Sequence, residues 1–417
     1  MTLFIRATAE AAPLTLEAAC SEIYDAALVE SVVGTVGLEV ETHLVDLAAP
    51  ADRVPWAGIC GAVDAATPQL RRSAITIEPG GQVELSGAPA PGISDAIAAM
   101  RRDEQRLRLV LAEHDLGLAH LGADPVRAPR RVNPRPRYRA MERHFIATGR
   151  AEAGATMMCA TAALQVNLQA GPRSSWAARV SLAHQLGPTL VAIAACSRWL
   201  GGKDSGWAST RQRAWSRLDP RTGGPVALAH DPADDWVRHA LAAPVLFART
   251  EGGDAVSIAR SVPFGAWLSG RVRLADRRPT VEDLHTHLST LFPPVRMRGY
   301  LELRYLDISA PRWWPAVAAV TTTLMDDAGA ADAAAAATDG TAGMWEAAAR
   351  CGLGDPALAA SARRCMAIAV DRVPPELGTA VADLAELVES GRSPGDVVVD
   401  RIREVGAQAV LEEVARA

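Results

Sequence analysis

The chain has 417 residues, of which 49% are hydrophobic and 22% are charged, and its formal net charge at pH 7 is −5. These values are typical of a folded globular protein that is long enough for one large domain or for two to three ordinary ones. The acidic balance argues against nucleic acid as a partner, because binding to phosphate backbones needs an excess of basic residues.

The sequence gives no sign of export or of membrane insertion. Residues 1–13 lack the basic and then apolar layout of a signal peptide, and no apolar run reaches the length of about 18 residues that a membrane span needs. The six cysteines are scattered without a C-x-x-C pair, so neither a zinc site nor a disulfide framework is indicated. We therefore expect a cytoplasmic protein with no membrane partner.

Helical and extended patterns alternate along the chain. Apolar residues at helical spacing predict helices over residues 15–32, 56–66, 94–115, 137–149 and 174–200, with a further helix from residue 207. Shorter apolar or alternating runs predict strands over residues 35–45, 73–77, 82–87, 117–122, 157–168 and 300–307. After Pro311 the chain is rich in Ala and helical, so we expect a core of residues 1–315 and a helical region of residues 316–417 packed on it.

The strand predicted over residues 35–45 carries two carboxylates. Glu39 and Glu41 share one face of it, while Leu38 and Val40 point to the other face. The Cα atoms of the two acids would lie about 6.6 Å apart, and carboxylates at that spacing repel by about 2.5 kcal/mol at an effective dielectric near 20. Such a pair is compatible with a solvated edge strand or with a bound cation.

Acids recur in two further strand regions. Glu78 precedes a Pro-Gly-Gly turn, and Glu84 lies in the alternating run that follows the turn. Glu302 and Arg304 share a face of the strand over residues 300–307. Carboxylates from several strands, with no Cys and little His among them, form a hard oxygen site suited to Mg²⁺ or Mn²⁺ and hence to phosphates. Arg304 would stabilise a phosphoryl group in transfer, or it would form a plain salt bridge with Glu302.

Two polar motifs lie between these strands. Gln165 and Asn167 are two apart at the end of the strand over residues 157–168, so both side chains lie on one face. Residues 201–206 read Gly-Gly-Lys-Asp-Ser-Gly, which lacks the first glycine of a phosphate-binding P-loop and has Asp after Lys203. The second motif is therefore not a P-loop.

In combination these motifs closely resemble the glutamate–cysteine ligases, especially the plant-type branch. The Arg- and Ala-rich character of the chain further suggests similarity to the actinobacterial enzymes that supply γ-glutamylcysteine for ergothioneine synthesis. The resemblance runs in order from about residue 34 to residue 315. Its most specific block is Glu-Pro-Gly-Gly-Gln-x-Glu-Leu-Ser-Gly at residues 78–87. The other matching segments are Gly-Leu-Glu-Val-Glu at 37–41, Gln-Val-Asn-Leu at 165–168, Gly-Lys at 202–203 with Arg211, and Leu-Phe-Pro at 291–293 leading to Tyr-Leu-Glu-Leu-Arg at 300–304.

The resemblance implies an α+β fold of the glutamine-synthetase type, which is a curved, mostly antiparallel sheet with helices on its back. It also implies ATP-dependent ligation of the L-glutamate γ-carboxylate to the amine of L-cysteine, through a γ-glutamyl phosphate. In the family pattern the Mg²⁺ ligands, with Mn²⁺ as a possible substitute, correspond to Glu39, Glu41, Glu78, Glu84 and Glu302. The expected catalytic residues are Arg304, Glu302 and Glu84, with Lys203 and Arg304 at the ATP phosphates and with Arg211, Gln165 and Asn167 at the substrate.

The sequence departs from the plant-type pattern at two places. Residues 305–307 read Tyr-Leu-Asp where plant enzymes carry a small, glycine-containing run, and residues 196–198 read Cys-Ser-Arg in place of an Asn-Ser-Pro-like turn. Both departures bear on the amine-acceptor pocket more than on the metal site. The alternatives are a ligase with another amine acceptor, a metal-dependent hydrolase and a non-catalytic binding homologue.

Overall fold

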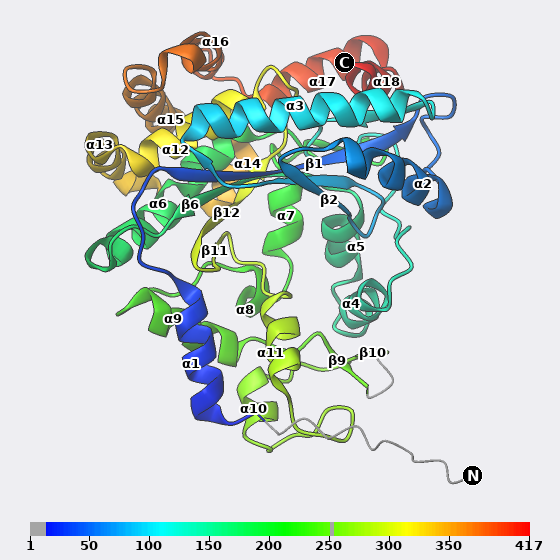
Figure 1. Cartoon of the computed structure of the whole chain (residues 1–417). Coiled ribbons are helices and arrows are strands. Elements are labelled where there is room, and N and C mark those ends of the chain that lie inside the picture. Colours follow the sequence, from blue (N-terminus) through cyan, green and yellow to red (C-terminus); the bar gives the residue numbers. More distant parts are fainter. Residues whose placement is uncertain (1–13, 251–253) are drawn as a thin grey trace.

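The computed structural model describes residues 14–250 and 254–417 (Figure 1). The prediction that no signal peptide is present concerns residues 1–13, which lie outside this range. Among the helices of the described residues, none is both long enough and apolar enough to cross a membrane.

An antiparallel sheet built around one long strand forms the centre of the fold. The strand order is β11-β12-β6-β1-β3-β2, and β4 and β5 also pair with β1. The strands of this sheet are β1 (Thr35–Asp46), β2 (Ser73–Ile77), β3 (Val83–Gly87), β4 (Ala90–Pro91), β5 (Leu116–Ala119), β6 (Ala163–Gln169), β11 (Val295–Met297) and β12 (Tyr300–Asp307). Two short hairpins lie outside it, β7 (Trp199–Leu200) with β8 (Lys203–Asp204) and β9 (Phe247–Arg249) with β10 (Ala255–Ser257).

Helices pack on the sheet and extend beyond it (Figure 1). In the first half of the chain they are α1 (Leu16–Ala27), α2 (Trp56–Ala66), α3 (Ile93–Ala112), α4 (Pro136–Ala147), α5 (Ala151–Cys159), α6 (Trp176–Ala194), α7 (Thr210–Ser216) and α8 (Pro220–Gly223). They continue with α9 (Pro232–Ala242), α10 (Phe264–Leu268), α11 (Val281–Leu288), α12 (Trp314–Asp326), α13 (Ala328–Thr338), α14 (Trp345–Cys351), α15 (Pro356–Val370), α16 (Gly378–Glu389), α17 (Pro394–Val405) and α18 (Ala407–Arg416).

The apolar face of β1 fixes the orientation of the sheet. Leu38 and Val40 are each 1% exposed and belong to the same core cluster as Met100 and Leu107 of α3. Burying a side chain of this size stabilises the fold by roughly 1.5–3 kcal/mol, and a register slip of one residue would exchange these side chains for carboxylates. The apolar alternation therefore holds Glu39 and Glu41 on the face that is turned away from this core.

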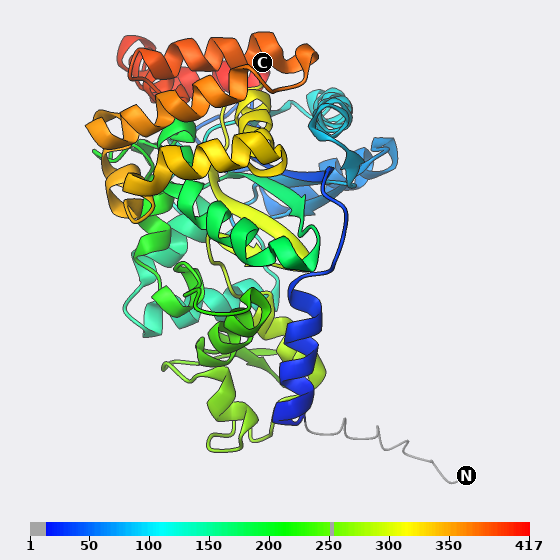
Figure 2. The same cartoon turned by 90° about the vertical axis from the view of Figure 1, so that its left-hand side faces the viewer.

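The chain after residue 315 contains only helices and connecting turns. Helix α12 packs against β6, α6 and α3, while α18 packs against β5 at the other end of β1. Figure 2 shows the C-terminal helices at one end of the molecule and α1 at the opposite end. The helical character predicted for this region is confirmed, and its separation from the core at residue 315 stays a prediction.

The strand expected over residues 157–168 is wrong in its first part. Met157 to Cys159 form the end of α5, and β6 begins only at Ala163. A continuous apolar run does not distinguish a buried helix end from a buried strand. The strand expected over residues 300–307 is observed with those bounds.

Candidate active site

Four neighbouring strands carry polar side chains on the face opposite the apolar core. Residues directly opposed in an antiparallel pair have Cβ atoms about 4.5–5.5 Å apart. The opposed pairs are Glu41 with Glu84, Glu39 with Gln165, Glu39 with Ser86 and Glu302 with Asn167. The sheet therefore brings together the acids that the sequence places on separate strands.

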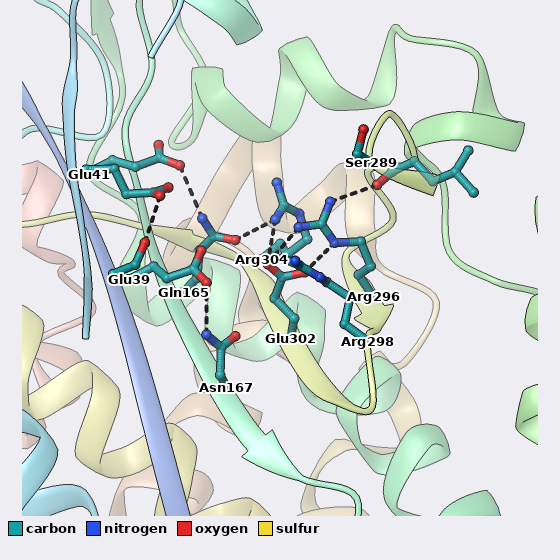
Figure 3. Close-up of polar contacts among 12 residues, drawn as sticks. Glu39, Glu41, Gln165, Asn167, Ser289, Arg296, Arg298, Glu302 and Arg304 are labelled. Carbon is teal, nitrogen blue, oxygen red and sulfur yellow. Dashed lines mark hydrogen bonds and ion pairs between the residues drawn. The ribbon is translucent and has the colours of Figure 1, made fainter. Parts of the chain in front are cut away.

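Amide groups of β6 hold the two acids of β1 in place (Figure 3). Asn167 donates a hydrogen bond to Glu39 at 3.0 Å, and Gln165 donates to Glu41 at 3.3 Å. The second oxygen of Glu41 accepts a hydrogen bond from the backbone N–H of Ala163 at 2.8 Å. These bonds explain the Gln-x-Asn spacing, because only residues two apart on β6 reach both acids.

Four carboxyl groups on this face have raised pKa values. Burial, followed by the charges of Glu302 and Glu84, raises the pKa of Glu39 to about 7. Burial, followed by Glu84 and Glu41, raises the pKa of Glu78 well above its usual range. Burial is also the largest cause of the raised pKa values of Glu41 and Glu84. The cluster therefore has less positive charge around it than four ionised carboxylates need.

Glu302 is in a different electrostatic environment, although it lies on the same face. Its side chain is fully buried and forms a two-point ion pair with Arg296, in which one bond measures 2.8 Å. Arg304 donates to the same carboxylate at 3.0 Å, and Arg298 lies 3.9 Å away. Burial alone would raise the pKa of Glu302, but Arg304 and Arg296 lower it to about 2. Glu302 is thus ionised and neutralised by arginines.

Several hydrogen-bond donors near these acids form no hydrogen bond to any described residue. They are Arg304 Nε, Arg211 Nη1 and Trp215 Nε1, and all three atoms are buried. The guanidinium carbons of Arg211 and Arg304 lie 5.8 and 6.0 Å from the centre of the Trp215 ring. Buried donors without partners are costly, so a ligand that carries acceptor oxygens, such as a carboxylate or phosphate, would stabilise this arrangement.

A cavity lies over this face of the sheet, and its lining combines polar and apolar side chains. The polar residues include Glu39, Glu41, Glu78, Glu84, Gln165, Arg211, Arg296, Arg298 and Arg304. The largely apolar residues include Tyr138, Met141, Met157, Met158, Trp215 and Phe292. The cavity can therefore take a ligand that combines strongly anionic groups with less polar parts.

The sequence reasoning missed several cavity residues. Arg296 and Arg298 alternate on and after β11, directly before the Glu302 strand, so their spacing could have placed them on the same face. Trp215 lies within the helix that the sequence predicts from residue 207, and no local pattern shows that this helix reaches the cavity. Lys203 is exposed on β8 and is not part of the cavity lining, so its expected contact with ATP stays a prediction.

The acids are not arranged as a ready-made metal site. Within residues 14–250 and 254–417, no three acidic, His or Cys side chains stand in positions that would hold a metal ion. The chemistry of the donors nevertheless fits a hard cation, because the cavity offers carboxylate oxygens and the buried Asn167 Oδ1 has no hydrogen-bond partner among the described residues.

Comparisons with known proteins agree with this geometry. The sequence pattern of glutamate–cysteine ligase family 2 (GCS2) matches residues 35–416. The chain belongs to this family. The resemblance predicted from the motifs, and with it the assignment to the glutamate–cysteine ligases, is therefore confirmed.

Glutamate–cysteine ligases from several organisms are similar to this family member. Glutamate–cysteine ligase EgtA from Mycobacterium tuberculosis is 48% identical over 388 residues, which cover 92% of this chain and 90% of the relative. EgtA from Mycolicibacterium smegmatis is 48% identical over 402 residues, covering 96% and 95%. The chloroplastic glutamate–cysteine ligase of Arabidopsis thaliana is 29% identical over 242 residues, covering 57% of this chain and 46% of the plant protein.

A solved structure supports the fold of this family member. The crystal structure of glutamate–cysteine ligase from Francisella tularensis in complex with AMP matches with a TM-score of 0.58 at 13% identity, covering 93% of this chain and 88% of that chain. The predicted α+β architecture, a mostly antiparallel sheet with helices packed on it, is thus confirmed.

The contrast between Glu39 and Glu302 predicts opposite effects on stability. In metal-free buffer at pH 8 we expect Glu39→Gln to raise the melting temperature by about 3 °C or more and Glu302→Gln to lower it by a similar amount. The ordinary pKa of Glu39 is 4.5 and its folded-state pKa is about 7, so the destabilisation of the fold grows as the pH rises from 4.5 and is complete above about 7. The gain from Gln should therefore vanish as the pH falls toward 4.5.

The change in melting temperature expected for Glu302→Gln has the opposite sign to that for Glu39→Gln, so the two variants can be compared directly. Its folded-state pKa is about 2, so its stabilisation is complete above pH 4.5 and is lost only as the pH falls toward 2. Melting curves of both variants between pH 4.5 and 8 make the measurement. A loss of stability in both variants at pH 8 would contradict the repulsion described for Glu39.

Proposed function

We propose that this chain joins the γ-carboxylate of L-glutamate to the amine of L-cysteine with ATP, giving γ-glutamylcysteine, ADP and phosphate, and that the product serves ergothioneine synthesis. The observation that carries the proposal is the placement of four under-neutralised carboxylates beside an arginine cluster in one cavity. Carboxylates of this kind can bind the metal ions that accompany nucleotide phosphates. The arginines can stabilise the negative charge on a phosphoryl group in transfer. Membership of the family and the 48% identity to EgtA relatives support the choice of substrates.

The residues have distinct proposed roles. Glu39, Glu41, Glu78 and Glu84 would hold Mg²⁺, which when bound supplies positive charge to the ATP phosphates. Gln165 and Asn167 position two of these acids through the hydrogen bonds described above. We propose Glu302 as a further ligand, whose carboxylate becomes available when phosphate oxygens take over the guanidinium groups that it now engages.

The arginines complete the proposed mechanism. Arg304 has a free buried Nε and would contact the γ-phosphoryl group as the glutamate carboxylate attacks it. Arg211 has a buried Nη1 that makes no hydrogen bond to the described residues, and it would bind a carboxylate of glutamate, which orients the γ-carboxylate for this attack. The amine of cysteine then displaces phosphate from the acyl phosphate.

An assay of ATP turnover with separate omission of each substrate tests this function. We expect ADP formation to need both glutamate and an amine acceptor, with γ-glutamylcysteine detected by mass. Glu41→Gln and Glu84→Gln should each lower turnover at least about a hundredfold, because each removes a ligand charge and keeps the side-chain volume. ADP formation without glutamate or without an amine would favour a hydrolase, and near wild-type turnover in both variants would reject the proposed ligand set.

Substitution of Arg304 and of Arg211 should change different kinetic parameters. Arg304→Lys keeps a charge but loses the planar two-point fork, so its effect should lie mainly in kcat. Arg211→Lys should mainly raise KM for glutamate, with KM for ATP less changed. Steady-state kinetics with glutamate and ATP varied separately, together with melting curves, make the measurement. If both variants lose stability and neither shows a selective kinetic defect, the arginines only hold the fold together.

A further inference from the structure

An irregularity in β12 lies directly beside the proposed site. Leu303 pairs with Val166 and Leu306 pairs with Leu164, so β12 has one more residue than β6 over this stretch. Such a bulge takes residues out of the regular ladder and bends the strand. Here the residues between the two pairs are Arg304 and Tyr305.

Helix α7 is bound to the backbone of this bulge. Arg211 donates through Nη2 to the carbonyl oxygen of Arg304 at 2.6 Å, and Gln212 donates to the carbonyl oxygen of Tyr305 at 2.8 Å. The side chain that is proposed to bind glutamate thus rests on the backbone of the residue proposed to contact the phosphoryl group. The distance between the Arg211 and Arg304 side chains therefore depends on the contacts that fix the position of α7.

Asp307, at the end of β12, holds the beginning of α7. One of its oxygens accepts from the Ser209 hydroxyl at 3.0 Å, and the other accepts from the Ser197 hydroxyl at 2.6 Å and from the Cys196 N–H at 3.0 Å. Ser209 is the N-cap of α7 and accepts from the N–H of Gln212. The network therefore joins strand end, loop and helix start in one buried unit.

The same network reaches Arg211 itself. The backbone N–H of Arg211 donates to the Ser197 hydroxyl at 3.1 Å, and its Nη1 lies 3.9 Å from Asp307. Both side chains of this ion pair are at most 3% exposed. Burial raises the pKa of the Asp307 carboxyl, while Arg211, Ser197, the Cys196 N–H and Ser209 oppose that rise. An acceptor role for both oxygens is typical of an ionised carboxylate.

The two segments that depart from the plant-type pattern are in direct contact. Residues 196–198 and 305–307 meet in the hydrogen bonds of Cys196 and Ser197 to Asp307. Each departure alone has no evident reason in the sequence. In the structure they supply the donors and the acceptor of one network.

We propose that Asp307 is a positioning residue which, through Ser197 and Ser209 and through its ion pair with Arg211, holds α7 so that Arg211 Nη1, which donates no hydrogen bond to the described residues, faces the carboxylate of glutamate. The inference rests on the proposed function, since it assigns Asp307 to the same site. Asp307 itself does not touch substrate. Its loss should leave phosphoryl transfer from bound substrates largely intact and should weaken the capture of glutamate.

The test compares Asp307→Asn with a matched variant elsewhere. The amide replaces one acceptor oxygen by a donor, so one side of the network is lost while the volume is kept. We expect KM for glutamate to rise at least about tenfold, while kcat and the KM values for ATP and cysteine change by less than about threefold. The control is Asp326→Asn, since only 11% of the Asp326 side chain is exposed and it is also paired with an arginine, Arg179, at 2.7 Å. It should lower the melting temperature without a selective rise in KM.

Each outcome decides between a positioning role and a structural one. Equal losses of melting temperature in the two variants, with KM for glutamate unchanged in Asp307→Asn, would overturn the inference. Should Asp307→Asn fail to fold, Ser197→Ala replaces it, and we expect a rise in KM for glutamate of about threefold, with an unchanged KM overturning the inference. Wild-type turnover and Arg211→Lys show separately whether the proposed function and the role of Arg211 hold.

Discussion

The apolar face of β1 and the carboxylates on its other face cannot be changed independently. Leu38 and Val40 lock the register of the strand into the core, and this leaves Glu39 and Glu41 facing the acids of neighbouring strands. Burial and mutual repulsion raise their pKa values, so the sheet holds charge in a place where its ionisation destabilises the fold. The stability of the core is what allows the sheet to maintain this unfavourable arrangement.

Arginines divide the cluster into two electrostatic regions. Around Glu302, three guanidinium groups neutralise one carboxylate, whereas four acids nearer β3 share little positive charge. This asymmetry matches the proposed chemistry, in which cations occupy the acidic region and the arginines meet the phosphoryl group. A site that is poorly neutralised before its ligands bind is expected where catalysis depends on charge brought in with the substrate.

Much of this arrangement follows from local sequence pattern. The two-residue spacing in Glu39-x-Glu41 and Gln165-x-Asn167 predicts a shared face on each strand, and the strands pair so that these faces coincide. The helix end at Met157 to Cys159 was mistaken for strand, because an apolar run lacks the period that separates the two. Boundaries of this kind depend on tertiary packing.

The arginine contacts were only partly predictable. Arg304 beside Glu302 follows from strand spacing, but the two-point pair of Arg296 with Glu302 depends on which strand lies at the sheet edge. The bulge in β12 and its bonds to α7 have no signal in the sequence, since they join segments about a hundred residues apart. The departures at residues 196–198 and 305–307 were visible, and only the structure shows that they touch.

The most direct test of the central claim is a crystal structure with Mn²⁺ and a non-hydrolysable ATP analogue, examined by anomalous scattering at the manganese edge. The account predicts manganese peaks within about 2.3 Å of carboxylate oxygens of Glu41 and Glu84, between β1 and β3, with the phosphates turned toward Arg304. Manganese bound only outside this face of the sheet, with nucleotide present in the cavity, would contradict it.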